Sequence, residues 1–179
     1  MATFNVPQRS EVNEVNQGIF DNLEKQLGFV PNLYATYALS NNALNNYLSL
    51  SGAKTSLNNK EKEVVNLAVS EVNGCDYCLA AHTAIAQMNG FTQEQTLELR
   101  AGKASFQTSY NALAGLAKNI TENRGRADKA VVDSFLAAGY TQENLVDTIV
   151  LVGDKTISNY LHNTTQVPVD FPAVEPLGA

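Results

Sequence analysis

The sequence predicts an all-α fold of about seven to nine helices, for three reasons. Apolar residues recur with the 3.6-residue period of a helix, and residues that favour helix ends separate these segments. In addition, no alternation of apolar and polar residues is long enough to predict a strand. The first helical segment spans residues 11–27 and ends at Gly28, and shorter helical pieces follow Pro31 and cover residues 44–50.

Two consecutive helices are predicted in the middle of the chain. Asn58 and Glu61 have the spacing of a capping box, which begins a helix whose later part, residues 64–72, is almost wholly apolar. A helix that is apolar on nearly every face is expected at the centre of the fold. Gly74 ends it, and a second helix is predicted from about Cys75 to Met88.

Further helices are predicted after this pair. Thr92 and Gln95 form a second capping-box pattern. The apolar run 149–152 is compatible with a strand, but it lies inside a longer helical rhythm and is therefore assigned to a helix. The predicted helices of this half of the chain are residues 93–101, 104–122, 127–138 and 142–162.

The chain is predicted to form a single domain over residues 1–179, with its core motif region at 57–102. Residues 165–179 contain three prolines and are expected to form an extended tail that packs on a neighbour. Residues 90–95 recur in altered form at 139–144, which indicates either a duplicated helical unit or chance. If the unit is duplicated, the second copy lacks the cysteines of the first, because Arg124 and Ala127 occupy the equivalent positions.

Composition excludes several function classes. The chain has a net charge of −6 with 12 scattered Lys and Arg residues, so nucleic acid is not an expected partner. No apolar stretch approaches 18 residues, and the first residues lack the pattern of a secretory signal, so neither a membrane span nor secretion is expected. We therefore expect a cytoplasmic location, where two cysteines three residues apart are typical of catalysis, redox chemistry or metal binding rather than a structural disulfide.

The two cysteines share a helix face with a histidine. At about 100° per residue, Cys75, Cys78 and His82 fall within roughly 60° of one another around the predicted helix. Cys75 lies at the helix start, where the helix dipole favours a thiolate, so this argument alone favours Cys75 as the more acidic thiol. His82 lies one turn beyond Cys78 and can take or return its proton.

Glu63 is the fourth candidate. It precedes Gly74 by 11 residues and His82 follows Gly74 by 8, so an antiparallel pair of helices would bring the two side chains within about one turn of each other. A carboxylate in that position could orient the imidazole. The alternative is a solvated first helical turn, because residues 60–63 read Lys-Glu-Lys-Glu.

These residues resemble the signature of the AhpD-like, or carboxymuconolactone decarboxylase, family. That signature has a Glu twelve residues before the first Cys of a CxxC pair and a His four residues after the second, and this chain has Glu63, Cys75, Cys78 and His82 at those positions. Residues 27–33, of sequence LGFVPNL, and Asn89-Gly90 also resemble the peroxidase-related branch.

The resemblance implies an AhpD-like helical fold that assembles as trimers or hexamers. We expect no cofactor and no metal. It also implies reduction of small or organic hydroperoxides: Cys78 attacks the peroxide, Cys75 resolves the sulfenic acid to a disulfide, and Glu63 and His82 relay protons. The implied reductant is a dithiol, for example a lipoyl-bearing protein. Where some members carry a His between the cysteines, this chain has Tyr77.

Other interpretations remain open at this point. The cysteines could be buried apolar residues, or zinc ligands with His82 and His162, although three ligands on one helix face fit tetrahedral zinc poorly. A carboxymuconolactone-type lyase is disfavoured by the intact CxxC pair and by the lack of a basic cluster for two carboxylates. A non-enzymatic redox sensor on the same scaffold is the third possibility. Tyr77 is expected to pack in the core or at an interface, and His162 is expected at the surface or at a helix cap.

Overall fold

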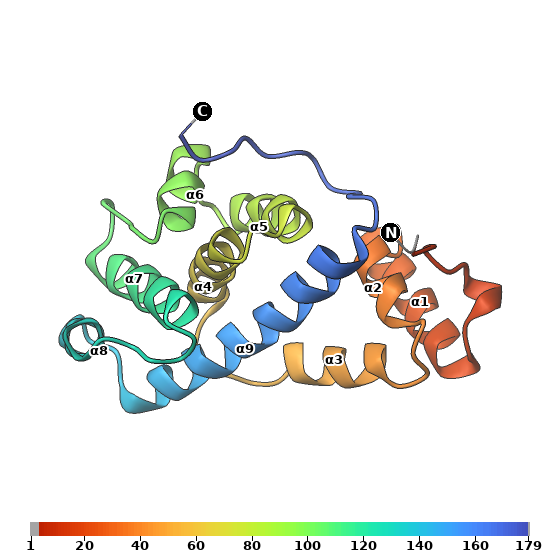
Figure 1. Cartoon of the computed structure of the whole chain (residues 1–179), viewed down its shortest axis with the longest axis horizontal. Helices are drawn as coiled ribbons and strands as arrows, with labels where there is room; N and C mark the ends of the chain where they lie inside the picture. Colours follow the sequence, from red (N-terminus) through yellow and green to blue (C-terminus); the bar gives the residue numbers. More distant parts are fainter. Residues whose placement is uncertain (1–3, 179) are drawn as a thin grey trace.

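The computed structural model describes residues 4–178, which form nine α-helices, one short 3₁₀ helix and no strand (Figure 1). The predicted all-α class and helix number are therefore confirmed. The 3₁₀ helix η1 spans Arg9–Glu11. The α-helices are α1 Glu14–Leu27, α2 Asn32–Tyr37, α3 Ala43–Ser51, α4 Asn59–Val72, α5 Asp76–Met88, α6 Gln93–Arg100, α7 Thr108–Glu122, α8 Lys129–Ala137 and α9 Gln142–Thr165.

Helix starts follow local side-chain chemistry. Asn58 and Glu61 form the predicted capping box, with the Asn58 side chain accepting from the Glu61 amide at 3.0 Å and the Glu61 carboxylate accepting from the Asn58 amide at 2.8 Å. Thr92 and Gln95 form the second predicted box at the start of α6. The apolar run 149–152 lies inside α9, as predicted.

The predicted start of α7 at residue 104 is wrong, because the helix begins at Thr108. The amide of Ala104 donates to the side chain of Asn111 at 3.0 Å, and the amide of Ser105 donates to the carboxylate of Glu98. Side-chain acceptors thus satisfy these two amides outside a helix, and the chain turns before α7 can begin.

Helix α4 is the centre of the fold. It packs against α5, α6, α7 and α9, and Figure 1 shows it between these helices. Its side chains Val64, Val65 and Leu67 are fully buried, and they pack with Leu113 of α7 and Phe135 of α8 in the larger of two apolar clusters. Burial of this continuous apolar surface stabilises the fold and fixes the position of α4.

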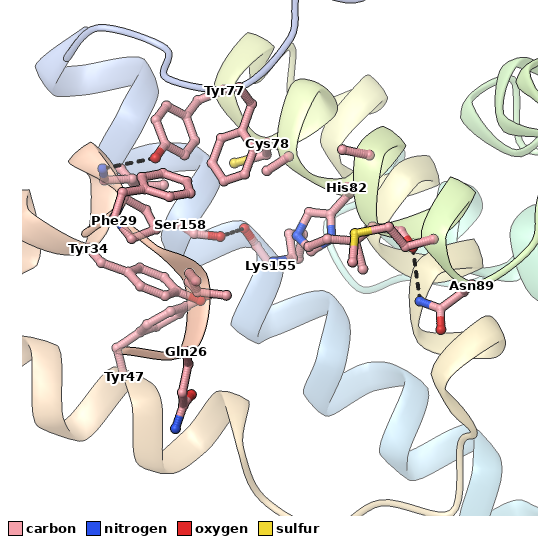
Figure 2. Close-up of a pocket in the computed structure, with 18 residues that line it drawn as sticks. Gln26, Phe29, Tyr34, Tyr47, Tyr77, Cys78, His82, Asn89, Lys155 and Ser158 are labelled. Atoms are coloured by element: carbon pink, nitrogen blue, oxygen red, sulfur yellow. Dashed lines mark hydrogen bonds between the residues drawn. The ribbon is translucent and has the colours of Figure 1, made fainter. Parts of the chain in front are cut away.

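A second apolar cluster joins the N-terminal helices to the cysteine motif. It contains Leu33 and Tyr47 from α2 and α3, and Cys75, Tyr77 and Cys78 from the start of α5. Figure 2 shows the side chains of Tyr77 and Cys78 on one side of this region and those of Tyr34 and Tyr47 on the other. The N-terminal helices therefore form one wall beside the motif, and α9 runs past both (Figure 1).

The C-terminal tail packs on its own chain. Asp170 accepts a hydrogen bond from the amide of Asn32 at 2.7 Å, and the guanidinium of Arg100 donates to the carbonyl of Glu175 at 2.8 Å. The ring of Phe171 lies 5.6 Å from that of Tyr77 in an edge-on arrangement. The tail is extended from residue 167 to 176, although Thr165 still belongs to α9, and these contacts hold it across α5 and α6. Packing of the tail on a neighbouring chain stays a prediction.

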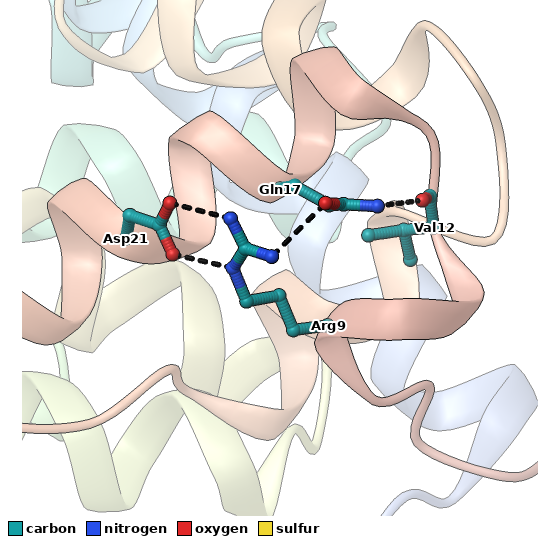
Figure 3. A network of polar contacts seen from close by, with 4 residues as sticks. All are labelled: Arg9, Val12, Gln17 and Asp21. Atoms are coloured by element: carbon teal, nitrogen blue, oxygen red, sulfur yellow. Dashed lines mark hydrogen bonds and ion pairs between the residues drawn. The ribbon is translucent and has the colours of Figure 1, made fainter.

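At the other end of the chain, a polar network fastens the 3₁₀ helix to α1 (Figure 3). Arg9 makes two bonds to the Asp21 carboxylate, at 2.6 and 2.8 Å, and a third to the Gln17 side chain at 3.0 Å. Gln17 in turn donates to the carbonyl of Val12 at 2.9 Å. The network is exposed to solvent, so it orients the chain more than it stabilises the fold.

The two similar segments, residues 90–95 and 139–144, occupy equivalent places in the chain. Each follows a helix and begins the next one with a threonine N-cap, Thr92 for α6 and Thr141 for α9. Arg124 and Ala127, which correspond to the cysteines, lie between α7 and α8. Helix-end chemistry alone accounts for this likeness, and the duplication remains a prediction.

None of the helices described over residues 4–178 is long and apolar enough to cross a membrane.

We expect Leu113→Ala to lower the free energy of unfolding by roughly 2–5 kcal/mol, because it leaves a cavity in the core between α4 and α7. Urea unfolding followed by circular dichroism measures this change. Val146→Ala on the exposed face of α9 is the matched control and should change stability by less than about 0.5 kcal/mol. Equal effects of the two substitutions would contradict the assignment of Leu113 to the core.

Candidate active site

The turn between α4 and α5 positions both cysteines. Gly74 adopts a left-handed conformation with φ of +61°, which a residue with a side chain rarely adopts. The next residue, Cys75, donates its amide to the carbonyl of Ser70 at 3.0 Å and is the N-cap of α5. Its Sγ accepts a hydrogen bond from the amide of Cys78 at 3.3 Å. The predicted helix thus begins one residue later than expected, and Cys75 caps it.

The two thiols differ in surroundings and acidity. Cys75 is 0% exposed, whereas Cys78 lines a cavity. A hydrogen bond from Cys75 is the main cause that lowers the pKa of Cys78 to about 6; burial opposes this effect, and the charges of Lys155 and His82 add to it. The same hydrogen bond and burial raise the pKa of Cys75. The helix dipole alone favoured Cys75, but the thiol–thiol contact reverses that order.

Glu63 and His82 are brought together as the spacing predicted. His82 Nδ1 lies 2.8 Å from Glu63 Oε2, and the side chain of Asn66 donates to Glu63 Oε1 at 3.0 Å. Glu63 is buried, which excludes a solvated first turn. Burial is the largest single effect and would raise the pKa of Glu63, but His82, Lys155 and Asn66 together outweigh it and the net pKa is lowered. The carboxylate is therefore ionised, and it fixes the orientation of the imidazole.

Cys78 and His82 face a cavity of about 550 Å³, which we call the thiol cavity. This volume is within the usual range for small-molecule sites. Lys155 is the one lysine in its described wall, which contains no Arg, Asp or Glu. Aromatic and aliphatic side chains form most of the wall, namely Leu27, Phe29, Pro31, Leu33, Tyr34, Tyr47, Tyr77, Ile85, Met88 and Phe171.

Sequence reasoning missed Lys155, which enters the thiol cavity from α9. Figure 2 shows it between the Tyr34 and Tyr47 side and His82. The signal in the sequence is Asp154-Lys155, a charged pair inside an otherwise apolar run, which suggests a solvated face of a helix. Both residues are nevertheless buried, because α9 packs against α4 on one side and α2 and α3 on another.

Tyr77 and His162 lie close to the site without joining the Glu63–His82 contact. Tyr77 is buried, as expected, and its hydroxyl accepts from the amide of Leu33 at 3.3 Å. The expectation that His162 lies at the surface or a helix cap is wrong. It is buried 5.3 Å from the Tyr77 ring, with Nε2 3.1 Å from the carbonyl of Val167, because the chain reverses at Gln166 and folds the tail over it.

Across residues 4–178, no group of three or more His, Cys, Asp or Glu side chains is arranged to hold a metal ion.

Comparison with known proteins agrees with this geometry. Residues 39–118, which contain all four candidate residues, match the carboxymuconolactone decarboxylase family. This match supports an assignment to the family, and the fold of the chain is AhpD-like. The protein is also similar to YdfG of Bacillus subtilis (strain 168), with 24% identity over 101 residues that cover 55% of this chain and 69% of YdfG.

Solved structures with the same fold include peroxidase-related proteins and a debrominase. A peroxidase-related protein from Ralstonia eutropha JMP134, described as an alkylhydroperoxidase AhpD core, superposes with a TM-score of 0.84 and 20% identity over 93% of this chain and 91% of its own. A peroxidase-related protein from Silicibacter sp. TM1040 gives 0.81 at 21% identity, over 93% and 90%. A Cys-to-Ala variant of the debrominase Bmp8 in complex with 2,3,4-tribromopyrrole gives 0.78 at 18% identity, over 95% and 93%.

We expect the alkylation rate of Cys78 by iodoacetamide to rise with pH and reach half its maximum near pH 6, because the thiolate is the reactive form. Mass spectrometry of the labelled peptide separates Cys78 from Cys75. Cys75→Ala should move the midpoint up toward the ordinary thiol value of about 8.5, since it removes the main hydrogen bond to the thiolate.

Cys75→Ser is the matched control, because its hydroxyl can still donate to the Cys78 sulfur and should keep the midpoint low. A midpoint that does not differ between the alanine and serine variants would contradict this origin of the acidity.

Proposed function

We propose that the protein is a thiol-dependent peroxidase of the carboxymuconolactone decarboxylase family, which reduces organic hydroperoxides through Cys78 and Cys75. The observation that carries the proposal is the thiol of Cys78 in the wall of the thiol cavity, next to a second thiol, Cys75, and beside a histidine held by a buried carboxylate. Low thiol pKa is the property that peroxide attack requires, because the thiolate is the nucleophile.

The proposed cycle balances without a cofactor. The Cys78 thiolate attacks the terminal peroxide oxygen, so that an S–O bond forms, the O–O bond breaks and an alkoxide leaves. The alkoxide takes a proton and departs as the alcohol. The Cys75 thiol then attacks the sulfenic acid of Cys78, giving a disulfide and water. A dithiol reductant, proposed to be of the lipoyl type, returns the two electrons by exchange through a mixed disulfide.

Glu63 and His82 are proposed to relay the protons of this cycle. Because Nδ1 of His82 is engaged by Glu63, Nε2 remains for the thiol cavity and its reactants. The imidazole can accept the Cys78 proton and later donate one to the leaving alkoxide. Glu63 stabilises the imidazolium that forms in between. The apolar wall of the thiol cavity favours an organic peroxide over a small polar one.

Homo-oligomerisation, as trimers or hexamers, is retained as a proposal from the resemblance. A monomeric mass by solution scattering would contradict it.

A second candidate is reductive dehalogenation of a halogenated aromatic compound. The aromatic wall of the thiol cavity beside the acidic Cys78 favours it, together with the likeness to the debrominase Bmp8. In this reaction a carbon-bound halogen leaves as halide, a proton takes its place, and the two thiols supply two electrons by forming a disulfide. Halide release from a bromopyrrole with no peroxide consumption would select this candidate. The lyase alternative is disfavoured by the single lysine in the cavity.

We expect Cys78→Ser to abolish the consumption of cumene hydroperoxide with a dithiol reductant, because it removes the attacking sulfur. Cys75→Ser is the matched comparison: it should react once with peroxide and accumulate a sulfenic acid, detected by dimedone labelling and mass spectrometry. Unchanged turnover in Cys78→Ser would contradict the mechanism, and a disulfide in the wild type confined to Cys75 and Cys78 would support it.

Glu63→Gln should reduce peroxide turnover by about 10²–10⁴-fold while leaving the fold intact, because the amide keeps the shape but cannot stabilise an imidazolium. Steady-state kinetics and circular dichroism measure the two effects. Glu61→Gln, in the same turn of α4 but at the capping box, is the control and should leave turnover within about threefold of wild type. Similar losses in both variants would argue against a relay role for Glu63.

A further inference from the structure

The most unusual charge in the molecule lies in the wall of the thiol cavity. Lys155 is only 5% exposed and belongs to the lining of the cavity. Among residues 4–178, its ammonium group forms no hydrogen bond or ion pair. Its backbone carbonyl accepts a hydrogen bond from the Ser158 hydroxyl at 3.0 Å. A buried charge without a direct partner is costly, so an anionic ligand that bonds the ammonium directly would stabilise it.

No carboxylate among the described residues forms an ion pair with Lys155. Glu63 is held by His82 and Asn66. Asp154, the preceding residue, lines a separate small hollow with Lys54 and Lys62. The side chains of Asp154 and Lys155 point in different directions because consecutive residues of a helix are about 100° apart. Lys155 is therefore the residue of this pair that faces the thiol cavity.

Lys155 remains charged in this position. Burial lowers its pKa, but Tyr47, Asp154 and Cys78 together hold the pKa above its usual range. The sulfur of Cys78 shares the cavity with Lys155, yet no hydrogen bond joins the sulfur and the ammonium. The ammonium is thus available to an anionic group that enters the cavity.

The rest of the cavity is built for an apolar body. Aromatic rings from five segments line it, among them Tyr34 and Tyr47, whose centroids lie 6.1 Å apart. Leu27, Ile85 and Met88 also line the cavity and are exposed, Met88 to 87%, so they continue the apolar surface outward to solvent. Such a wall binds hydrocarbon or aromatic groups by excluding water, and it strengthens any single charge interaction inside.

From these contacts we propose that Lys155 is the anion-binding residue of the thiol cavity, and that the ligand is an apolar organic acid with one carboxylate. The inference rests on the proposed function only in its last step, in which the substrate is a hydroperoxide of such an acid. Binding of the acid itself requires no turnover.

The test compares 3-phenylpropanoate with its neutral amide, 3-phenylpropanamide, by isothermal titration calorimetry on the reduced wild-type protein at pH 7. The two probes have the same apolar body and differ in charge. We expect the carboxylate to bind about tenfold or more tightly than the amide, as is typical of a charge-assisted hydrogen bond in a dry site. Equal affinities, or no binding of either probe, would overturn the proposal.

Three variants test whether the preference for the carboxylate probe depends on Lys155. Lys155→Met should bind both probes equally, because it keeps the length of the side chain and removes its charge. Lys155→Arg should keep part of the preference, and Lys103→Met, at an exposed lysine outside the cavity, should keep all of it. A carboxylate preference that survives Lys155→Met would overturn the assignment. If Lys155→Met does not fold, the comparison of the two probes on the wild type and on Lys155→Arg still tests the proposal.

The outcome separates this inference from the proposed function. Peroxide consumption without any preference for the acid would leave the peroxidase proposal standing and remove the role of Lys155. Preference for the acid without peroxide consumption would keep the anion site and remove the peroxidase proposal.

Discussion

The left-handed turn at Gly74 is the constraint on which the site depends. It ends α4 and lets the next residue cap α5, so the two helices pack against each other with Glu63 and His82 in contact. The same turn buries the sulfur of Cys75 against the amide of Cys78. One backbone conformation thus sets both the thiol pair and the carboxylate–imidazole pair, because both depend on how the helices are joined.

Burial decides how the charged groups of the site behave. Glu63 stays ionised inside the protein because the imidazole of His82 and the amide of Asn66 offset its loss of water. Cys78 becomes acidic because a neighbouring thiol donates to its sulfur and the charge of Lys155 lies nearby. The order of acidity in a thiol pair therefore follows from local hydrogen bonds more than from the helix dipole, which acts on Cys75 first.

Most of the secondary structure could be predicted because its signals are local. Capping boxes at Asn58 and Thr92 and the glycine after α4 act within one helical turn, so the residues themselves carry the information. The start of α7 was misplaced because the amides of Ala104 and Ser105 are bound by side chains of Asn111 and Glu98, a contact that helix periodicity does not describe.

The sequence by itself determined the all-helical class and the four spaced residues Glu63, Cys75, Cys78 and His82, because helix geometry converts their spacing into proximity once one turn is known. Only the tertiary structure decided what surrounds them. The thiol cavity is assembled from segments as distant as Leu27 and Phe171, and it turns Lys155 from an apparent surface charge into a buried one. Long-range packing sets burial, and burial sets the acidity and the ligand preference of the site.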